Sequence, residues 1–144
     1  GAVGVANKTA ITEDELQVWV DNNLVNYLGT TDSVQDIISK VDCVVLPSYR
    51  EGTPRSLLEA CAMEKPIIAT DVVGCKDVVD NGINGYLCKV KDADDLALKM
   101  EKILNLSNPE LTKMGQNGRD KIIRDFDEKI VIEKYLESIR DILK

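Results

Sequence analysis

Residues 44–69 read V-V-L-P-S-Y-R-E-G-T-P-R-S-L-L-E-A-C-A-M-E-K-P-I-I-A, and this stretch decides the fold. The apolar run 43–46, closed by Pro47 and Ser48, predicts a strand. A helix is expected to begin at Thr53-Pro54 and to run to about residue 64, and the β-branched run 66–70 predicts the next strand. Because both strands are almost wholly apolar, they are typical of a parallel sheet that is covered on both faces.

Upstream of this unit, the pattern predicts a helix, a strand and a second helix. Thr12 and Glu15 have the spacing of a capping box, and the helix that they open would bury Leu16, Trp19 and Val20. The remaining expected elements lie at residues 2–5 (strand), 24–28 (strand ended by Gly29) and 34–41 (amphipathic helix).

Downstream, a short helical piece is expected at 76–79 and a strand at 86–90, with two Asn-Gly turns between them. After Asp92 the pattern is wholly helical, so residues 92–144 form the all-helical end of the same unit. Alternating strands and helices predict a doubly wound α/β domain with a parallel sheet, whose ligands bind at the carboxyl ends of the strands. Since no helix precedes the strand at 2–5, we expect that a first strand-helix unit is missing.

Composition narrows the classes of function. The 144 residues are 44% hydrophobic and 30% charged, which is typical of a folded domain and not of a disordered chain. The 25 Asp and Glu residues outnumber the 18 Lys and Arg residues, and a net charge of −7 disfavours general nucleic-acid binding. There is no histidine in the chain, which excludes Ser-His-Asp and Cys-His chemistry from these residues alone.

No cofactor and no catalytic metal are predicted. The four cysteines, at positions 43, 61, 75 and 88, contain no C-x-x-C pair, and we interpret them as reduced thiols of a cytoplasmic protein. Asp92-Ala93-Asp94 matches a D-x-D metal motif, but it opens a helix, where aspartate serves as a cap. No segment approaches the length of a membrane span.

The loop between the first two strands of residues 44–69 carries the chemistry. Glu51-Gly52-Thr53 precedes the helix that begins at Pro54, and the free amides and positive dipole end of that helix favour a phosphate. Glu59 lies roughly 7 to 8 Å along the helix axis from its start. Two carboxylates so placed can accept hydrogen bonds from hydroxyls at opposite ends of an elongated ligand with phosphates in its middle, as in a nucleotide sugar.

The spacing Glu51-x7-Glu59 within L-P-S-Y-R-E-G-T-P-R-S-L-L-E-A-C-A closely resembles the E-x7-E signature of GT4-type retaining glycosyltransferases (glycosyl transferases group 1) of the GT-B fold. The flanking residues 65–71, Gly74, 80–87 and 114–119 agree as well, so the likeness covers nearly the whole chain. The resemblance implies that residues 1–144 are the carboxy-terminal, donor-binding lobe of an enzyme of capsular or surface polysaccharide biosynthesis.

The resemblance also implies a role for each residue of the site. Glu51 is expected to be the catalytic residue of this lobe, in contact with hydroxyls of the transferred sugar, and Glu59 to bind the ribose hydroxyls. Base contacts are expected near Gly29 and Thr30. Arg55 either is a surface cation or helps to neutralise the diphosphate. The expected donor-binding residues are Glu51, Gly52, Thr53, Pro54, Arg55, Ser56, Glu59, Gly29 and Thr30, with Pro54 contributing no amide N–H.

The expected full-length enzyme transfers a hexose or N-acetylhexosamine from a nucleotide sugar, of which a UDP-sugar is favoured, to a glycan or lipid-linked glycan held by an absent amino-terminal lobe. That lobe would also carry the family's histidine and any peripheral membrane contact at the inner face of the membrane, and this chain alone is expected to be inactive. The alternatives are a GT-B sugar-nucleotide epimerase and a non-enzymatic acidic α/β binding module. The last helix, 128–144, is expected to dock on the absent lobe, which would leave an apolar stripe exposed in this chain and favour its self-association.

Overall fold

A computed structural model describes residues 11–143 of the chain, which divides into two units, residues 1–34 and 35–144. The smaller unit contains α1 (Glu13–Asp21). The predicted capping box is confirmed, because the Glu15 amide donates to Thr12 Oγ1 at 3.2 Å while the Glu15 carboxylate accepts from the Thr12 amide at 3.0 Å. The predicted buried side is wrong, since none of the residues of α1 is buried.

The strand predicted at residues 24–28 is also wrong. These residues form no strand, and Leu24 and Leu28 are 70% and 60% exposed. An apolar run becomes a strand only where a neighbouring strand pairs with its backbone, and in the described part of the chain this run has no such neighbour. The strand predicted at residues 2–5 lies outside the described residues.

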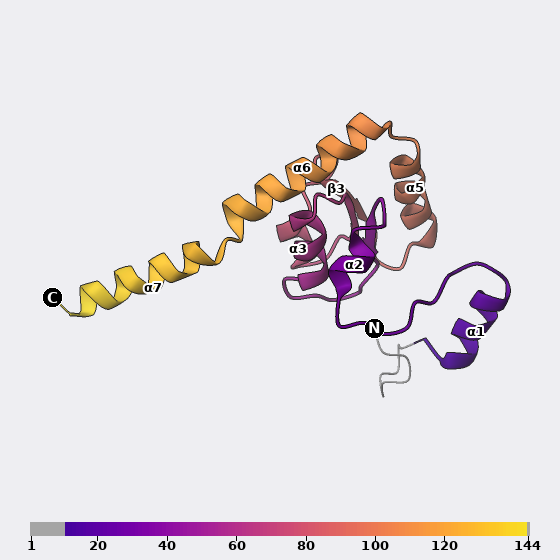
Figure 1. The fold of residues 1–144 in the computed structure, drawn as a ribbon, viewed down its shortest axis with the longest axis horizontal. Helices are drawn as coiled ribbons and strands as arrows, with labels where there is room; N and C mark the ends of the chain where they lie inside the picture. Colours follow the sequence, from indigo (N-terminus) through magenta and orange to yellow (C-terminus); the bar gives the residue numbers. More distant parts are fainter. Residues whose placement is uncertain (1–10, 144) are drawn as a thin grey trace. The chain divides into compact units, whose positions relative to one another are not determined.

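The larger unit is built on a parallel sheet of β1 (Val44–Leu46), β2 (Ile67–Thr70) and β3 (Gly85–Cys88), in the order β1-β2-β3. Val45 pairs with Ile68, which pairs in turn with Tyr86. The connecting helices are α3 (Arg55–Ala62) and α4 (Cys75–Val78), and α2 precedes the sheet (Figure 1). The α2 helix spans Val34–Ile38, so it is shorter than the predicted 34–41.

Helices cover both faces of the sheet, because alternate residues of β2 enter two separate hydrophobic clusters. Ile67 and Ala69 pack with α3 and α4, whereas Ile68 packs with α5 (Ala93–Leu104) and with the start of α6 (Asn108–Asp125). All four residues of β2 are buried. The predicted fold class, α/β with a parallel sheet covered on both faces, is therefore confirmed.

Aspartates set where β3 ends and α5 begins. The Asp92 side chain accepts from the Asp95 amide at 2.9 Å, as its predicted cap role requires. The Asp95 carboxylate accepts from the Lys89 amide at 2.8 Å, which turns the chain out of the sheet, so β3 ends at Cys88 and not at the predicted residue 90. This hydrogen bond, more than any other contact, lowers the pKa of Asp95.

The final helix, α7 (Glu128–Ile142), has no buried residue. Apart from the half-buried Ile130, its apolar side chains are exposed, and those at positions 132, 136 and 139 follow helical spacing. An exposed apolar stripe is what the sequence predicts for this segment. Self-association through it stays a prediction, and light scattering that shows a clean monomer at high concentration would contradict it.

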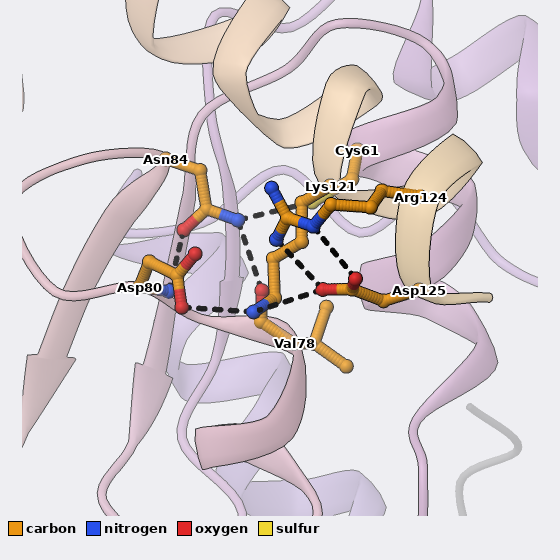
Figure 2. A network of polar contacts seen from close by, with 7 residues as sticks. All are labelled: Cys61, Val78, Asp80, Asn84, Lys121, Arg124 and Asp125. Atoms are coloured by element: carbon orange, nitrogen blue, oxygen red, sulfur yellow. Dashed lines mark hydrogen bonds and ion pairs between the residues drawn. The ribbon is translucent and has the colours of Figure 1, made fainter.

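A polar network joins the end of α4, the turn before β3 and the end of α6 (Figure 2). Asn84, which is 1% exposed, accepts from the Asp80 amide at 2.8 Å and donates to the Val78 carbonyl at 2.9 Å. Lys121 Nζ lies 2.8 Å from an Asp80 carboxylate oxygen and 3.7 Å from one of Asp125. The network holds the second Asn-Gly turn against α6 and so positions β3 beside β2.

Candidate functional site

The loop from β1 to α3 brings the first predicted glutamate to the carboxyl edge of the sheet. Glu51 is half-buried, Gly52 and Thr53 are exposed, and Pro54 is buried at the N-cap of α3. A buried proline here fixes the entry of the helix without needing a hydrogen-bond donor. This loop is the one that the sequence predicts as the phosphate and sugar site.

The start of α3 presents backbone donors to this loop. The amides of Leu57 and Leu58 both donate to the Pro54 carbonyl, at 3.1 and 3.2 Å, and are the first amides to bond within the helix. The amides of Arg55 and Ser56 precede that first bond, where helix geometry leaves N–H groups for an outside acceptor. An anion is therefore favoured at this position by both donors and dipole.

The second predicted glutamate lies on α3, one turn beyond Arg55. Arg55 Nη2 is 3.5 Å from a Glu59 carboxylate oxygen, and the two side chains are 90% and 28% exposed. A pair this open to water holds neither side chain strongly, so Glu59 remains available to a ligand. The contact places the positive charge of Arg55 beside Glu59 on α3. Whether Arg55 also neutralises a diphosphate stays a prediction.

The backbone of Gly74 packs directly against the Glu51–Gly52 loop, a contact that the sequence analysis did not predict. Its φ is +86°, and a Cβ at this position would lie 1.7 Å from the Gly52 carbonyl oxygen and 2.9 Å from that of Glu51. Only a glycine lets the two backbones approach so closely. Gly74 comes 22 residues after Gly52 in the sequence, so nothing local to the loop reveals the contact.

A cavity of about 620 Å³ opens beside Glu51, between the loops that follow β1 and β2. Of the predicted donor-binding residues, Glu51 lines it. The other residues that line the cavity were not predicted. They could have been found from the rule that ligands bind where parallel strands end, since Asp71 directly follows β2. The lining residues are Tyr49, Arg50, Glu51, Asp71, Val72, Val73 and Lys76.

The structure brings together Glu51, Gly52, Thr53, Pro54, Arg55, Ser56 and Glu59, which all belong to the β1–α3 loop and α3. Gly29 and Thr30 are exposed and belong to the smaller unit. Their predicted contact with the nucleotide base stays a prediction.

The cysteines take no part in the chemistry of this site. All four are free, and burial raises the pKa of Cys43 and of Cys61 to about 12. Burial also raises the pKa of Cys75, with a further contribution from the charge of Glu51. Thiols held protonated in this way make poor nucleophiles.

Native protein should therefore react slowly with a thiol reagent such as DTNB at about pH 8, whereas the four cysteines of denatured protein should react quickly, each releasing one thionitrobenzoate anion from the reagent. Absorbance of the released product gives both rates. A fast phase in native protein would show that at least one thiol is more accessible than its burial indicates.

Among residues 11–143, no group of three histidine, cysteine or acidic side chains lies in an arrangement that could hold a metal ion. None of the helices in the same range combines the length and the apolar character that a membrane span requires.

The profile of one protein family, glycosyl transferases group 1, matches residues 13–121, which include the loop, both glutamates, Gly74 and the cavity. The chain belongs to the glycosyl transferases group 1 family. Membership confirms the resemblance drawn from the E-x7-E spacing and its flanks. It does not favour the epimerase or the non-enzymatic module as alternatives.

Two proteins that are similar to this chain are named as glycosyltransferases. The chain is 32% identical over 126 residues to N,N'-diacetylbacillosaminyl-diphospho-undecaprenol alpha-1,3-N-acetylgalactosaminyltransferase of Campylobacter jejuni, covering 88% of this chain and 33% of that protein. It is 37% identical over 126 residues to the capsular polysaccharide biosynthesis glycosyltransferase CapM of Staphylococcus aureus, covering 88% and 32%. The chain thus spans about a third of the length of these relatives.

A solved structure agrees with the fold. The chain superimposes on a TarM variant from Staphylococcus aureus, crystallised with UDP among its ligands, with a TM-score of 0.80 and 26% identity. The match covers 89% of this chain and 27% of that one. The superposition and its coverage confirm the fold predicted for the chain, which is that of one lobe of a GT-B glycosyltransferase.

Proposed function

We propose that this chain is the donor-binding lobe of a retaining, metal-independent glycosyltransferase. The enzyme would move a hexose or N-acetylhexosamine from a UDP-sugar to a lipid-linked glycan or another surface-polysaccharide precursor. The observation that carries this proposal is the placement of Glu51 and Glu59 on either side of the free amides at the start of α3.

That placement matches the chemistry of a nucleotide sugar from end to end. The amides of Arg55 and Ser56 would bind the diphosphate, and Glu59, further along α3, would accept hydrogen bonds from the ribose hydroxyls. Glu51 would accept from hydroxyls of the sugar, next to the bond that breaks. The backbone of Gly52 and Thr53, exposed in the same loop, would complete the binding site around the sugar and diphosphate.

The names of the relatives support the substrates proposed. The Campylobacter jejuni relative is named for a diphospho-undecaprenol acceptor, and the TarM structure contains UDP. We extend both to this protein as proposals: a UDP-sugar donor, and an acceptor bound by a second lobe at the inner face of the membrane. Because transfer needs donor and acceptor in reactive geometry, the 144-residue chain alone would bind donor without catalysing transfer.

Replacing Glu59 with alanine tests this site. Loss of charge-assisted hydrogen bonds to the ribose should weaken UDP binding about tenfold or more, since each contributes roughly 1.5–3 kcal/mol. Calorimetry, or saturation-transfer NMR if binding is weak, gives the affinities. Glu101→Ala, which removes an exposed glutamate from the last turn of α5, is the matched control and should bind UDP like the wild type. Equal affinities for Glu59→Ala and the wild type would remove Glu59 from the site.

A further inference from the structure

Two charged side chains, Asp71 and Lys76, line the cavity opposite the loop that carries Glu51. Asp71 directly follows β2, and its amide donates to the Cys88 carbonyl at 2.7 Å, which holds its backbone at the sheet edge. Lys76 lies in α4, and its amide donates to the Val72 carbonyl at 3.1 Å. Lys76 Nζ is 3.0 Å from Asp71 Oδ1, so the two side chains form one neutral ion pair on the cavity lining.

This pair does little for stability. The side chains of Lys76 and Asp71 are 55% and 48% exposed, and pairs so open to water typically contribute about 0.2–1 kcal/mol. The side chain of the paired Lys121, in contrast, is 10% exposed within the interior network. The Asp71–Lys76 pair therefore stands at the surface of the cavity with donors and acceptors still open to a ligand.

The rest of the cavity suits a sugar ring. Val72 and Val73 supply apolar surface, and Tyr49, with Lys91 Nζ 5.4 Å from its ring centroid, supplies an aromatic side chain. A pyranose needs both kinds of wall, because it carries hydroxyls around its rim and C–H groups on its faces. The volume of about 620 Å³ falls within the range of small-molecule sites.

The proposed orientation of the donor places its sugar in this cavity. If Glu59 binds the ribose and the start of α3 binds the diphosphate, the sugar lies at the Glu51 end, and Glu51 lines the cavity. We propose that Asp71 and Lys76 read the hydroxyls of the transferred sugar, the carboxylate accepting from one hydroxyl and the ammonium donating to its neighbour. This inference rests on the proposed function and adds a specificity wall that lies 20 residues or more from Glu51 in the sequence.

The experiment separates the sugar from the nucleotide. The 144-residue chain is titrated with UDP and with UDP-GlcNAc, UDP-GalNAc and UDP-glucose, and the ratio of the UDP-sugar affinity to the UDP affinity is compared among variants. Asp71→Asn and Lys76→Met should each leave UDP binding within about twofold of the wild type. Each should lower the ratio about five- to tenfold for the preferred sugar, because a hydroxyl loses its charged partner.

Glu64→Gln is the matched control, since it breaks another ion pair of half-exposed side chains, Glu64–Arg119, on the same unit. It should change neither affinity nor ratio. Ratios of Asp71→Asn and Lys76→Met equal to that of the wild type would overturn the inference and leave the proposed function standing. Failure of the wild-type chain to bind UDP would overturn the proposed function, and the inference with it.

Discussion

Replacing Gly74 with alanine is expected to destabilise the protein by about 2–4 kcal/mol and to abolish most UDP binding. Two costs combine at this position: a non-glycine residue must adopt a φ of +86°, and its Cβ would lie 1.7 Å from the Gly52 carbonyl oxygen. The opposing atom is backbone, so it cannot move without moving the loop. Displacement of the loop would carry the backbone of Gly52 and Thr53, together with Glu51, away from the start of α3, where we propose that the diphosphate binds.

Gly82→Ala is the control that separates these two costs. Gly82 has a φ of +81°, nearly the same as that of Gly74, but a Cβ there would meet no atom within 4 Å. Its substitution should cost about 1 kcal/mol and leave UDP binding unchanged. Urea unfolding gives the stabilities and calorimetry the affinities. If Gly74→Ala is no more destabilising than Gly82→Ala, the contact with the Glu51–Gly52 loop does not constrain the site.

The second large effect is expected at Asn84, whose replacement by alanine should cost about 2–4 kcal/mol. The side chain is buried, and its loss would leave the Asp80 amide and the Val78 carbonyl without their partner. An unpaired buried polar group costs roughly 1–3 kcal/mol, and a small cavity adds to this. Figure 2 shows the contacts that link Asn84 to Asp80, Val78 and Cys61. Thermal or urea unfolding measures the change.

Asn117→Ala provides the comparison for Asn84. Asn117 Nδ2 donates to the Ile83 carbonyl at 3.0 Å from a half-buried position on α6, in a hydrogen bond that is exposed to solvent. Water can replace that bond, so the substitution should cost less than about 1 kcal/mol. UDP affinity should stay unchanged in Asn117→Ala and in folded Asn84→Ala, because neither residue belongs to the β1–α3 loop or to α3, where we propose that UDP binds. A similar loss of stability in both variants would show that burial is not what makes the Asn84 bonds matter.

Local patterns predicted most of the elements correctly. The capping box at Thr12, the strand within 43–46, the helix after Pro54 and the helices that follow Asp92 are all present. These features depend on neighbours in sequence: a cap acts within one turn, and a buried strand shows as an apolar run. Boundaries moved where a side chain from outside the element intervened, as when the Asp95 side chain bonds the Lys89 amide and ends β3 early.

The prediction failed where an element needed a partner that its own residues do not specify. Residues 24–28 have the composition of a strand, but they form none, because a strand exists only through hydrogen bonds to another strand. The same limit applies to the expected buried side of α1.

For this protein, the sequence by itself determined which groups lie at the start of α3, where we propose that the donor binds. Glu51, the free helix amides and Glu59 all lie within nine residues, and local backbone geometry sets their order along a ligand. Only the tertiary structure decided what stands opposite them. Gly74, Asp71 and Lys76 lie beside the proposed site because parallel pairing of β1 and β2 brings the ends of both strands to one edge, and that pairing is a contact between distant parts of the chain.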